Sequence, residues 1–253
     1  MRIVFFGDSL TEGVDGAPYL GVLAQRAAND ARLRDIEMIN AGIGGDTTEH
    51  LLARVARDVV ARQPDAVLVQ VGNNDCTTLL MRRRLPTLPN LRTRYYFFRR
   101  KGVRGAVTPD RYAAALRAIV ATLREGCPTA RIALCTPPTI GEAPGSHTWR
   151  ALDRYAATVR TVAADCATDL LDLRAAFARE LEGLPPAPAT GLRGIANERR
   201  ARAVRDQGIE AQAQARGLRL TYDSLHFTAR GAELMAGVIW PWLVAVASGD
   251  ENI

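Results

Sequence analysis

The sequence predicts a single α/β domain built on a mostly parallel sheet, and three observations carry this prediction. Short apolar runs of strand length alternate along the chain with longer segments of helical periodicity. The apolar runs barely alternate with polar residues, which is typical of parallel strands that helices cover on both faces. The chain has 253 residues, of which 47% are hydrophobic and 24% charged, enough for one domain with a sizeable core.

Five segments have the length and composition of buried strands. Each is short and rich in Val, Ile or Leu, and helix-like stretches separate them. The expected strands cover residues 3–6, 36–40, 66–71, 132–136 and 170–173. Because helices separate successive strands, we expect right-handed crossovers between parallel neighbours.

Helical periodicity indicates five helices between and after these strands. They cover residues 17–29, 47–62, 109–124, 146–165 and 229–246. Thr108 followed by Pro109 is a capping residue with a proline in the first turn, which favours a helix start there. Pro64 and Pro128 each stand between a helix and the next strand, where a proline helps to end the helix.

Two stretches interrupt this alternation. Residues 77–107 contain many arginines and the aromatic run YYFF. Residues 183–217 open with several prolines and continue as an Arg/Ala/Gln-rich segment that we expect to be helical. Loops this long are usually functional or mobile. We therefore interpret residues 1–253 as one domain with insertions at about 77–107 and 183–217.

The basic charge of the chain is concentrated in the first insertion. Between Cys76 and Pro109 there are nine basic residues and no acidic one, so the rest of the chain carries a net −3, the difference between +6 and +9. Three interpretations stay open for this insertion. It is a solvated surface, a site for an anionic group that arginine forks would bind, or a surface for nucleic acid or an acidic membrane.

Secretion and membrane crossing are not expected from the sequence. We find no run of about 18 apolar residues, so we expect no membrane span. Arg2 is followed by only four apolar residues before Gly7, too few for a signal peptide. The four cysteines show no CxxC and no metal-ligand spacing, so we expect free thiols, buried at Cys135 and Cys166, in a reducing compartment. The sequence favours a cytoplasmic protein.

Polar side chains and glycines follow the ends of the predicted strands. GDSL follows the first strand and contains Ser9, GIGGDTT follows the second, and GNND follows the third and contains Asn74. A fourth segment, DSLH, precedes the last helix and contains Asp223 and His226. Because ligands of open parallel sheets bind beyond the carboxyl ends of the strands, we expect the four segments to meet at one rim.

These segments supply the parts that an acyl-transfer site requires. A serine hydroxyl is a poor nucleophile until a base takes its proton, and of the three histidines only His226 has a carboxylate three residues earlier, Asp223. The tetrahedral oxyanion needs donors, which the backbone N–H groups of Ser9 and Gly45 and the side-chain amide of Asn74 can supply. A glycine suits this position because no Cβ obstructs the approach of the backbone to a substrate.

Each segment alone also has a purely structural interpretation. GDSL and GGDTT can cap helices, GNND can form a turn, and DSLH can be a capped helix start. His50 and His147 lie near helix starts and are interpreted as surface or satisfied histidines. Two interpretations stay open for Glu12 and Asp15: they line the pocket or, as we favour, they are solvated loop residues. Four such coincidences in order on one rim would be rare, so we favour the catalytic interpretation.

In this order the four segments resemble the sequence blocks of the SGNH hydrolases, also called the GDSL esterase/lipase family. The resemblance covers all four blocks and most of the chain. It implies a three-layer α/β/α sandwich like that of flavodoxin. It also implies Ser9 as the nucleophile with Asp223 and His226 as its partners, and an oxyanion hole formed by Ser9, Gly45 and Asn74.

Two positions of the resemblance are ambiguous. VGNND contains two asparagines, and the GxND pattern selects Asn74 over Asn73. GIGGDTT contains Gly42, Gly44 and Gly45, and the place directly before the aspartate favours Gly45. The chain lacks a GxSxG elbow, which disfavours an ordinary α/β-hydrolase.

We interpret the protein as a serine esterase that hydrolyses a small-molecule ester through an acyl-enzyme, with His226 as the general base. No metal or organic cofactor is expected. Two rivals stay open: an acyltransferase that uses a sugar or other alcohol in place of water, and a non-catalytic flavodoxin-like binding domain that uses the basic insertion. The sequence names neither the ester nor the oligomeric state.

The first insertion supplies candidate substrate contacts. Arg82, Arg83 and Arg84 would bind an anionic ester, and Tyr95 and Tyr96 would form part of an apolar lid over an acyl chain. The aromatic run can equally be the packed base of the insertion. We expect no nucleic-acid partner.

Overall fold

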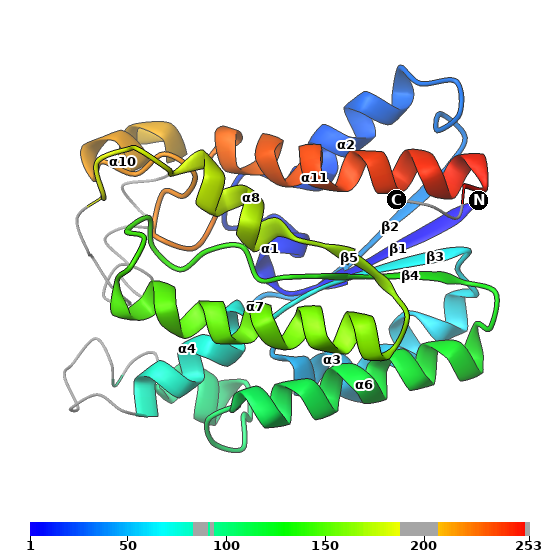
Figure 1. The fold of residues 1–253 in the computed structure, drawn as a ribbon, viewed down its shortest axis with the longest axis horizontal. Coiled ribbons are helices and arrows are strands. Elements are labelled where there is room, and N and C mark those ends of the chain that lie inside the picture. Colours follow the sequence, from blue (N-terminus) through cyan, green and yellow to red (C-terminus); the bar gives the residue numbers. More distant parts are fainter. Residues whose placement is uncertain (83–90, 92–93, 188–206, 251–253) are drawn as a thin grey trace.

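Five parallel strands form the sheet in the computed structural model, which describes residues 1–82, 91, 94–187 and 207–250 (Figure 1). The strands are β1 (Arg2–Gly7), β2 (Glu37–Gly42), β3 (Ala66–Gln70), β4 (Arg131–Cys135) and β5 (Asp169–Leu171). Their order is β2-β1-β3-β4-β5, and every ladder between them is parallel. All five expected strands are confirmed, and this order is the flavodoxin-like one. The sheet is fully parallel, whereas the sequence predicted a mostly parallel sheet.

The helices that the periodicity predicts are also present. They are α2 (Tyr19–Ala28), α3 (Thr48–Asp58), α6 (Pro109–Gly126), α7 (His147–Asp165) and α11 (Ala229–Ser248). The predicted helix 47–62 is split, because α3 ends at Asp58 and a 3-10 turn, η1 (Val60–Arg62), follows it. The Thr108 side chain accepts a hydrogen bond from the N–H of Arg111 ahead of the first turn of α6, so the expected cap is confirmed.

Further helices are not predicted by the sequence. These are α1 (Ser9–Glu12), α4 (Asn73–Arg82) and α8 (Leu173–Glu180). Helix α1 is a single turn, too short to show a period, and α4 opens with the polar run NNDCTT. α10 (Ile209–Ala215) lies in the segment that is expected to be helical within 183–217. A π-helical turn, η2 (Tyr96–Arg100), lies within 77–107.

Helices cover both faces of the sheet, which gives three layers. Alternate strand residues face a core shared with α3, α6 and α7 on one side, and a second core shared with α2, α8 and α11 on the other. Figure 1 shows these two helical layers above and below the strands. On β1, Val4 and Phe6 belong to the first core and Ile3 and Phe5 to the second. This explains why the strands read as unbroken apolar runs.

Helix α11 is long and apolar enough to cross a membrane by length and composition alone. Its sequence contains no unbroken apolar run of about 18 residues, because Arg230 and Glu233 interrupt the first turns of the helix. In the structure α11 packs on the sheet, and Met235, Ile239 and Trp242 are fully buried in the second core. We therefore interpret α11 as a core helix.

The four cysteines are free thiols. Cys76, Cys127 and Cys135 are buried, and Cys166 is only partly buried, since it caps the end of α7 at the protein surface. The expectation of a buried thiol is therefore confirmed for Cys135 and holds only in part for Cys166.

Candidate active site

The nucleophile candidate Ser9 is the first residue of α1, directly after the carboxyl end of β1. The preceding Asp8 provides the helix cap, because its side chain accepts the N–H of Leu10 at 3.0 Å. The structural interpretation of GDSL is therefore correct for Asp8. It leaves the hydroxyl of Ser9 for other partners, and Ser9 keeps 6% of its surface exposed.

Ser9, His226 and Asp223 form a continuous chain of hydrogen bonds. The Oγ of Ser9 lies 3.0 Å from Nε2 of His226, and Nδ1 of His226 lies 2.7 Å from Oδ2 of Asp223. Asp223 is fully buried, and its Oδ1 accepts the N–H groups of Leu225 and His226 at 2.9 and 2.6 Å. With Asp223 ionised, Nδ1 donates to it and Nε2 is left to accept a proton from Ser9.

The loop that carries Asp223 and His226 is held in a sharp conformation. Ser224, between them, has a positive φ of 78°, which is uncommon for a residue with a side chain. Its carbonyl accepts the N–H of Gly141 at 2.7 Å. An antiparallel bridge between Thr221 and Phe227 closes the loop. This backbone conformation places the carboxylate of Asp223 within hydrogen-bond distance of the imidazole of His226.

Glu142, a residue that the sequence does not indicate, stabilises this loop. Glu142 is 3% exposed, and its carboxylate accepts the backbone N–H groups of Arg219, Leu220 and Thr221 at 2.8, 2.9 and 2.6 Å. The hydroxyl of Thr221 donates to the same carboxylate. No local pattern marks Glu142, because its partners lie far along the chain.

The two loops that carry Gly45 and Asn74 lie beside Ser9 and its neighbour Asp8. A Cβ added to Gly44 would lie 3.9 Å from Cβ of Ser9, so the loop after β2 runs beside the nucleophile. Gly45 has a φ of +77°, a conformation that favours glycine. The amide nitrogen of Asn74 donates to the carbonyl of Asp46 at 2.9 Å and lies 3.4 Å from Oδ2 of Asp8.

The residues of the two ambiguous segments, VGNND and GIGGDTT, have different surroundings in the structure. The side chain of Asn73 donates to the carbonyl of Thr139 at 2.7 Å, whereas Asn74 lies between Asp8 and the loop after β2. A Cβ on Gly42 would strike the backbone of Glu12, so this glycine serves packing. The geometry thus favours Asn74 and a donor in the Gly44–Gly45 turn.

Burial raises the pKa of two carboxyl groups at the candidate site, those of Asp8 and Asp75. Desolvation raises the pKa of Asp8 to about 7, and the charge of Asp75 adds to this rise. Desolvation also raises the pKa of Asp75 to about 7, although the hydroxyl and the N–H of Thr48 donate to it. Both groups therefore carry less negative charge near neutral pH than surface carboxylates do.

Acidic side chains also lie at the opening of the site. Oδ2 of Asp15 lies 3.9 Å from Nε2 of His226, and this side chain is 60% exposed. A Cβ on Gly44 would lie 2.7 Å from Oε2 of Glu12. Glu12 and Asp15 therefore border Ser9 and His226, which agrees with the interpretation that they line the pocket and differs from the favoured one of solvated loop residues.

The predicted substrate contacts of the first insertion are only partly described. Arg83 and Arg84 lie outside the described residues, and Arg82 is the last residue of α4. Tyr95 is 61% exposed and Tyr96 38% exposed. Tyr96 reaches the site, because its hydroxyl donates to the carbonyl of Gly44 at 3.3 Å.

The two remaining histidines, His50 and His147, lie outside the hydrogen-bonded chain from Ser9 to Asp223. His50 is satisfied, since Nδ1 accepts the N–H of Thr47 at 3.0 Å and Nε2 lies 2.6 Å from the carbonyl of Lys101. His147 is an exposed residue at the start of α7. Among residues 1–82, 91, 94–187 and 207–250, no group of three or more His, Cys, Asp or Glu is placed to hold a metal ion.

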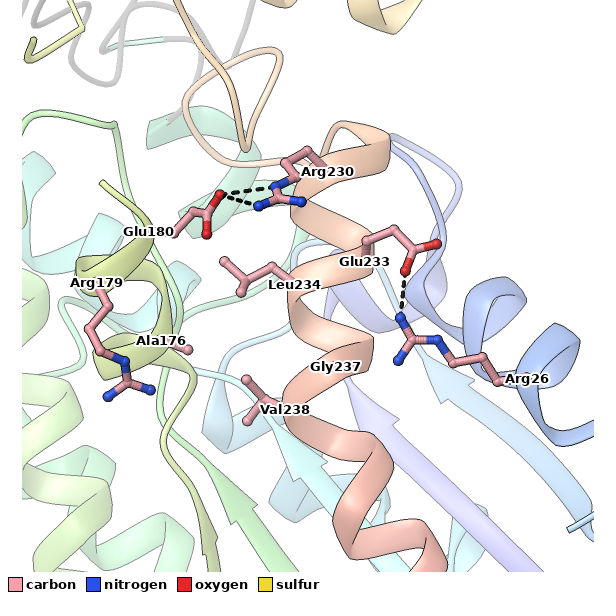
Figure 2. A pocket seen from close by; sticks show the side chains of 9 residues that line it. All are labelled: Arg26, Ala176, Arg179, Glu180, Arg230, Glu233, Leu234, Gly237 and Val238. Carbon is pink, nitrogen blue, oxygen red and sulfur yellow. Dashed lines mark hydrogen bonds and ion pairs between the residues drawn. The ribbon is translucent and has the colours of Figure 1, made fainter. Parts of the chain in front are cut away.

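A narrow crevice lies beside Ser9 and has no room for a water-sized molecule in this structure. It is lined by Ser9, Leu10, Gly13, Gly16, Ala17, His226 and Phe227. A separate groove runs over α8 and α11, where Glu180 pairs with Arg230 and Glu233 with Arg26 (Figure 2). That groove contains paired charges and apolar side chains, and it is lined by no serine, cysteine or histidine.

Esterases are among the known proteins to which the sequence is similar. An acetylxylan esterase of Geobacillus stearothermophilus is 27% identical over 199 residues, which are 74% of this chain and 82% of that protein. An isoamyl acetate-hydrolyzing esterase 1 homolog of Rattus norvegicus is 29% identical over 188 residues, 68% of this chain and 66% of that protein.

The fold and the family follow from two further comparisons. The solved structure of the Geobacillus stearothermophilus acetylxylan esterase matches with a TM-score of 0.65 at 23% identity, over 96% of this chain and 93% of that one, and this likeness shows the shared fold. A model of the GDSL-like lipase/acylhydrolase family matches residues 5–234. Since that match spans most of the sequence, the protein belongs to the GDSL-like lipase/acylhydrolase family.

Proposed function

We propose that this ester hydrolase works as a serine esterase, with Ser9 as the nucleophile, His226 as the general base and Asp223 as the residue that orients it. The observation that carries the proposal is the unbroken chain from Oγ of Ser9 through His226 to the buried carboxylate of Asp223. Oγ attacks the ester carbonyl while Nε2 takes its proton. His226 then protonates the leaving alcohol, and water hydrolyses the acyl-enzyme by the same route.

Three donors would stabilise the oxyanion of the tetrahedral intermediate: the N–H of Ser9, the N–H of Gly45 and the amide of Asn74. One proton of the Asn74 amide is engaged by the carbonyl of Asp46 at 2.9 Å. The other faces Asp8 at 3.4 Å, longer than an ordinary N–H···O bond of roughly 2.7–3.2 Å. That weakly held proton is the one available to a substrate oxygen.

We further propose a short acyl group, with an acetyl ester as the first candidate. The crevice beside Ser9 has no room for a water-sized molecule in this structure, so it offers no preformed tunnel for a long acyl chain. Two curated relatives are named as an acetylxylan esterase and an isoamyl acetate-hydrolyzing esterase homolog, and both names specify acetate esters. The acidic side chains of Glu12 and Asp15 favour a neutral ester over an anionic one at this opening.

Hydrolysis of p-nitrophenyl esters from acetate to palmitate tests the proposal. Wild type and Ser9→Ala are compared, with Ser248→Ala as a control that removes an exposed hydroxyl at the end of α11. We expect Ser9→Ala to lose activity by a factor of about 10,000 or more with unchanged circular dichroism, and the control to match wild type. We expect the rate of the wild type to fall as the acyl chain lengthens.

Two results would contradict parts of the proposal. Activity retained by Ser9→Ala would remove Ser9 as the nucleophile. A preference for palmitate over acetate would remove the short acyl group while leaving the nucleophile in place.

A further inference from the structure

The orientation of the Gly44–Gly45 peptide plane must be fixed by contacts from outside this peptide. A trans peptide is planar, so the carbonyl of Gly44 and the N–H of Gly45 point in opposite directions from one rigid unit. Glycine on both sides leaves this unit free to rotate, and Gly45 already has a φ of +77°. A rotation of the unit would aim a carbonyl, and not an N–H, at a substrate oxyanion.

Tyr96 contacts this peptide from outside the four family segments. Its hydroxyl donates to the carbonyl of Gly44 at 3.3 Å. A Cβ added to Gly45 would lie 2.2 Å from that hydroxyl oxygen and 2.8 Å from Cε1 of the ring, so the ring lies directly against Gly45. Burial, with the charges of Asp15, Asp46 and Glu12, raises the pKa of Tyr96, which keeps its hydroxyl protonated as a donor.

The turn that carries Tyr96 is attached to the same loop at two further points. Lys101 follows η2, and its N–H donates to the carbonyl of Tyr96 at 2.9 Å. Its Nζ lies 2.7 Å from Oδ1 of Asp46, next to Gly45. Its carbonyl lies 2.6 Å from Nε2 of His50, whose Nδ1 accepts the N–H of Thr47. These contacts hold both ends of η2 against the loop after β2.

We propose that Tyr96 is a positioning residue that aims the N–H of Gly45 at the oxyanion, and that Lys101 and His50 hold the turn that presents it. The inference rests on the proposed serine-esterase function. The hydrogen bond to the Gly44 carbonyl fixes the orientation of the peptide plane, and it polarises the peptide so that its N–H becomes a better donor. Because the oxyanion develops only after attack, the contribution of Tyr96 falls on kcat.

Tyr96→Phe removes the hydroxyl and keeps the ring that packs against Phe97, with ring centroids 5.2 Å apart. With p-nitrophenyl acetate we expect kcat to fall about threefold to tenfold and KM to stay within about twofold, as the loss of one hydrogen bond predicts. A boronic acid, which forms a tetrahedral adduct with the serine, should bind more weakly by a similar factor. Amide hydrogen exchange of residues 43–47 should become faster.

Lys101→Met gives a second, independent test. Asp46 keeps its buried ion pair with Arg54 at 2.8 Å, so the variant is expected to fold. We expect the same loss of kcat and the same faster exchange, and rescue of both by Lys101→Arg. Arg34→Met is the control, because it removes an exposed cation that pairs with Asp35 ahead of β2, at the opposite end of the sheet.

Outcomes separate this inference from the function on which it rests. If Tyr96→Phe and Lys101→Met match wild type in kcat, inhibitor affinity and exchange, the positioning role is wrong. If Tyr96→Phe raises KM and leaves kcat and exchange unchanged, Tyr96 is a substrate contact and the inference is again wrong. If wild type and Ser9→Ala are equally active, the serine-esterase proposal itself fails.

Discussion

Replacement of Asp223 by asparagine tests the orientation of His226 most directly. In the wild type, Oδ1 of Asp223 accepts two backbone N–H groups, at 2.9 and 2.6 Å, and Oδ2 accepts Nδ1–H of His226 at 2.7 Å. An asparagine that keeps its oxygen on the two backbone donors turns its NH₂ group toward Nδ1. Nδ1 must then accept, the proton moves to Nε2, and Nε2 can no longer take the proton of Ser9.

The structure sets the size of the effect. To restore the productive tautomer the asparagine must flip, which leaves the buried N–H groups of Leu225 and His226 facing an NH₂ group. Each unsatisfied buried donor costs about 1–3 kcal/mol, so the flip costs about 2–6 kcal/mol. A penalty of that size corresponds to a rate loss between about 30-fold and about 25,000-fold.

The assay is the steady-state hydrolysis of p-nitrophenyl acetate by wild type and Asp223→Asn, with thermal unfolding to show that the variant is folded. Asp165→Asn is a matched control, because Asp165 is an exposed carboxylate that pairs with Arg117 on the helical surface. A loss smaller than tenfold in Asp223→Asn would refute the tautomer argument. An equal loss in the control would show that the assay reports general damage.

Two further predictions concern stability. Glu142→Gln keeps one oxygen for its donors but turns an NH₂ group toward the N–H of Arg219, so the free energy of unfolding in urea should fall by about 2–3 kcal/mol, and a fall below about 1 kcal/mol would contradict the role of Glu142. Because burial raises the pKa of Asp75 from 3.8 to about 7, the folded protein retains a proton that the unfolded chain loses. Stability should therefore decline as the pH rises from about 4 to about 7. Asp75→Asn should flatten this decline between pH 5 and pH 8 in urea unfolding, and an unchanged slope would argue against the buried carboxyl.

The elements that sequence predicted well are those whose signal lies within a few residues. The strands β1 and β3 are unbroken apolar runs because both faces are covered, and Thr108 with Pro109 marks the start of α6. The split of the helix predicted at 47–62 was missed, because η1 preserves a helical pattern although its hydrogen bonds differ. Helix α1 was missed because a single turn has no period.

The candidate site also contains some residues that the sequence predicts and others that it does not. Ser9, Asp223 and His226 were predictable because each lies in a short segment of distinctive composition, and Asp223 and His226 are three residues apart. The support from Glu142 was not predictable, since its donors lie 77 to 79 residues away. The aromatic run predicts Tyr96 as a substrate contact. Its hydrogen bond to the Gly44 carbonyl joins residues 52 apart in the sequence, so that bond is visible only in the folded chain.

The span of the triad along the chain has a consequence for how the protein is made. During synthesis Ser9 leaves the ribosome before His226, which follows 217 residues later. Domains begin to fold from the N-terminus during synthesis, so β1 and Ser9 can be in place long before the base exists. On the proposed mechanism, a nascent chain carries Ser9 without its base, and we expect esterase activity only after the segment with Asp223 and His226 has folded. In a translation reaction, the time at which esterase activity appears would therefore report when folding is complete.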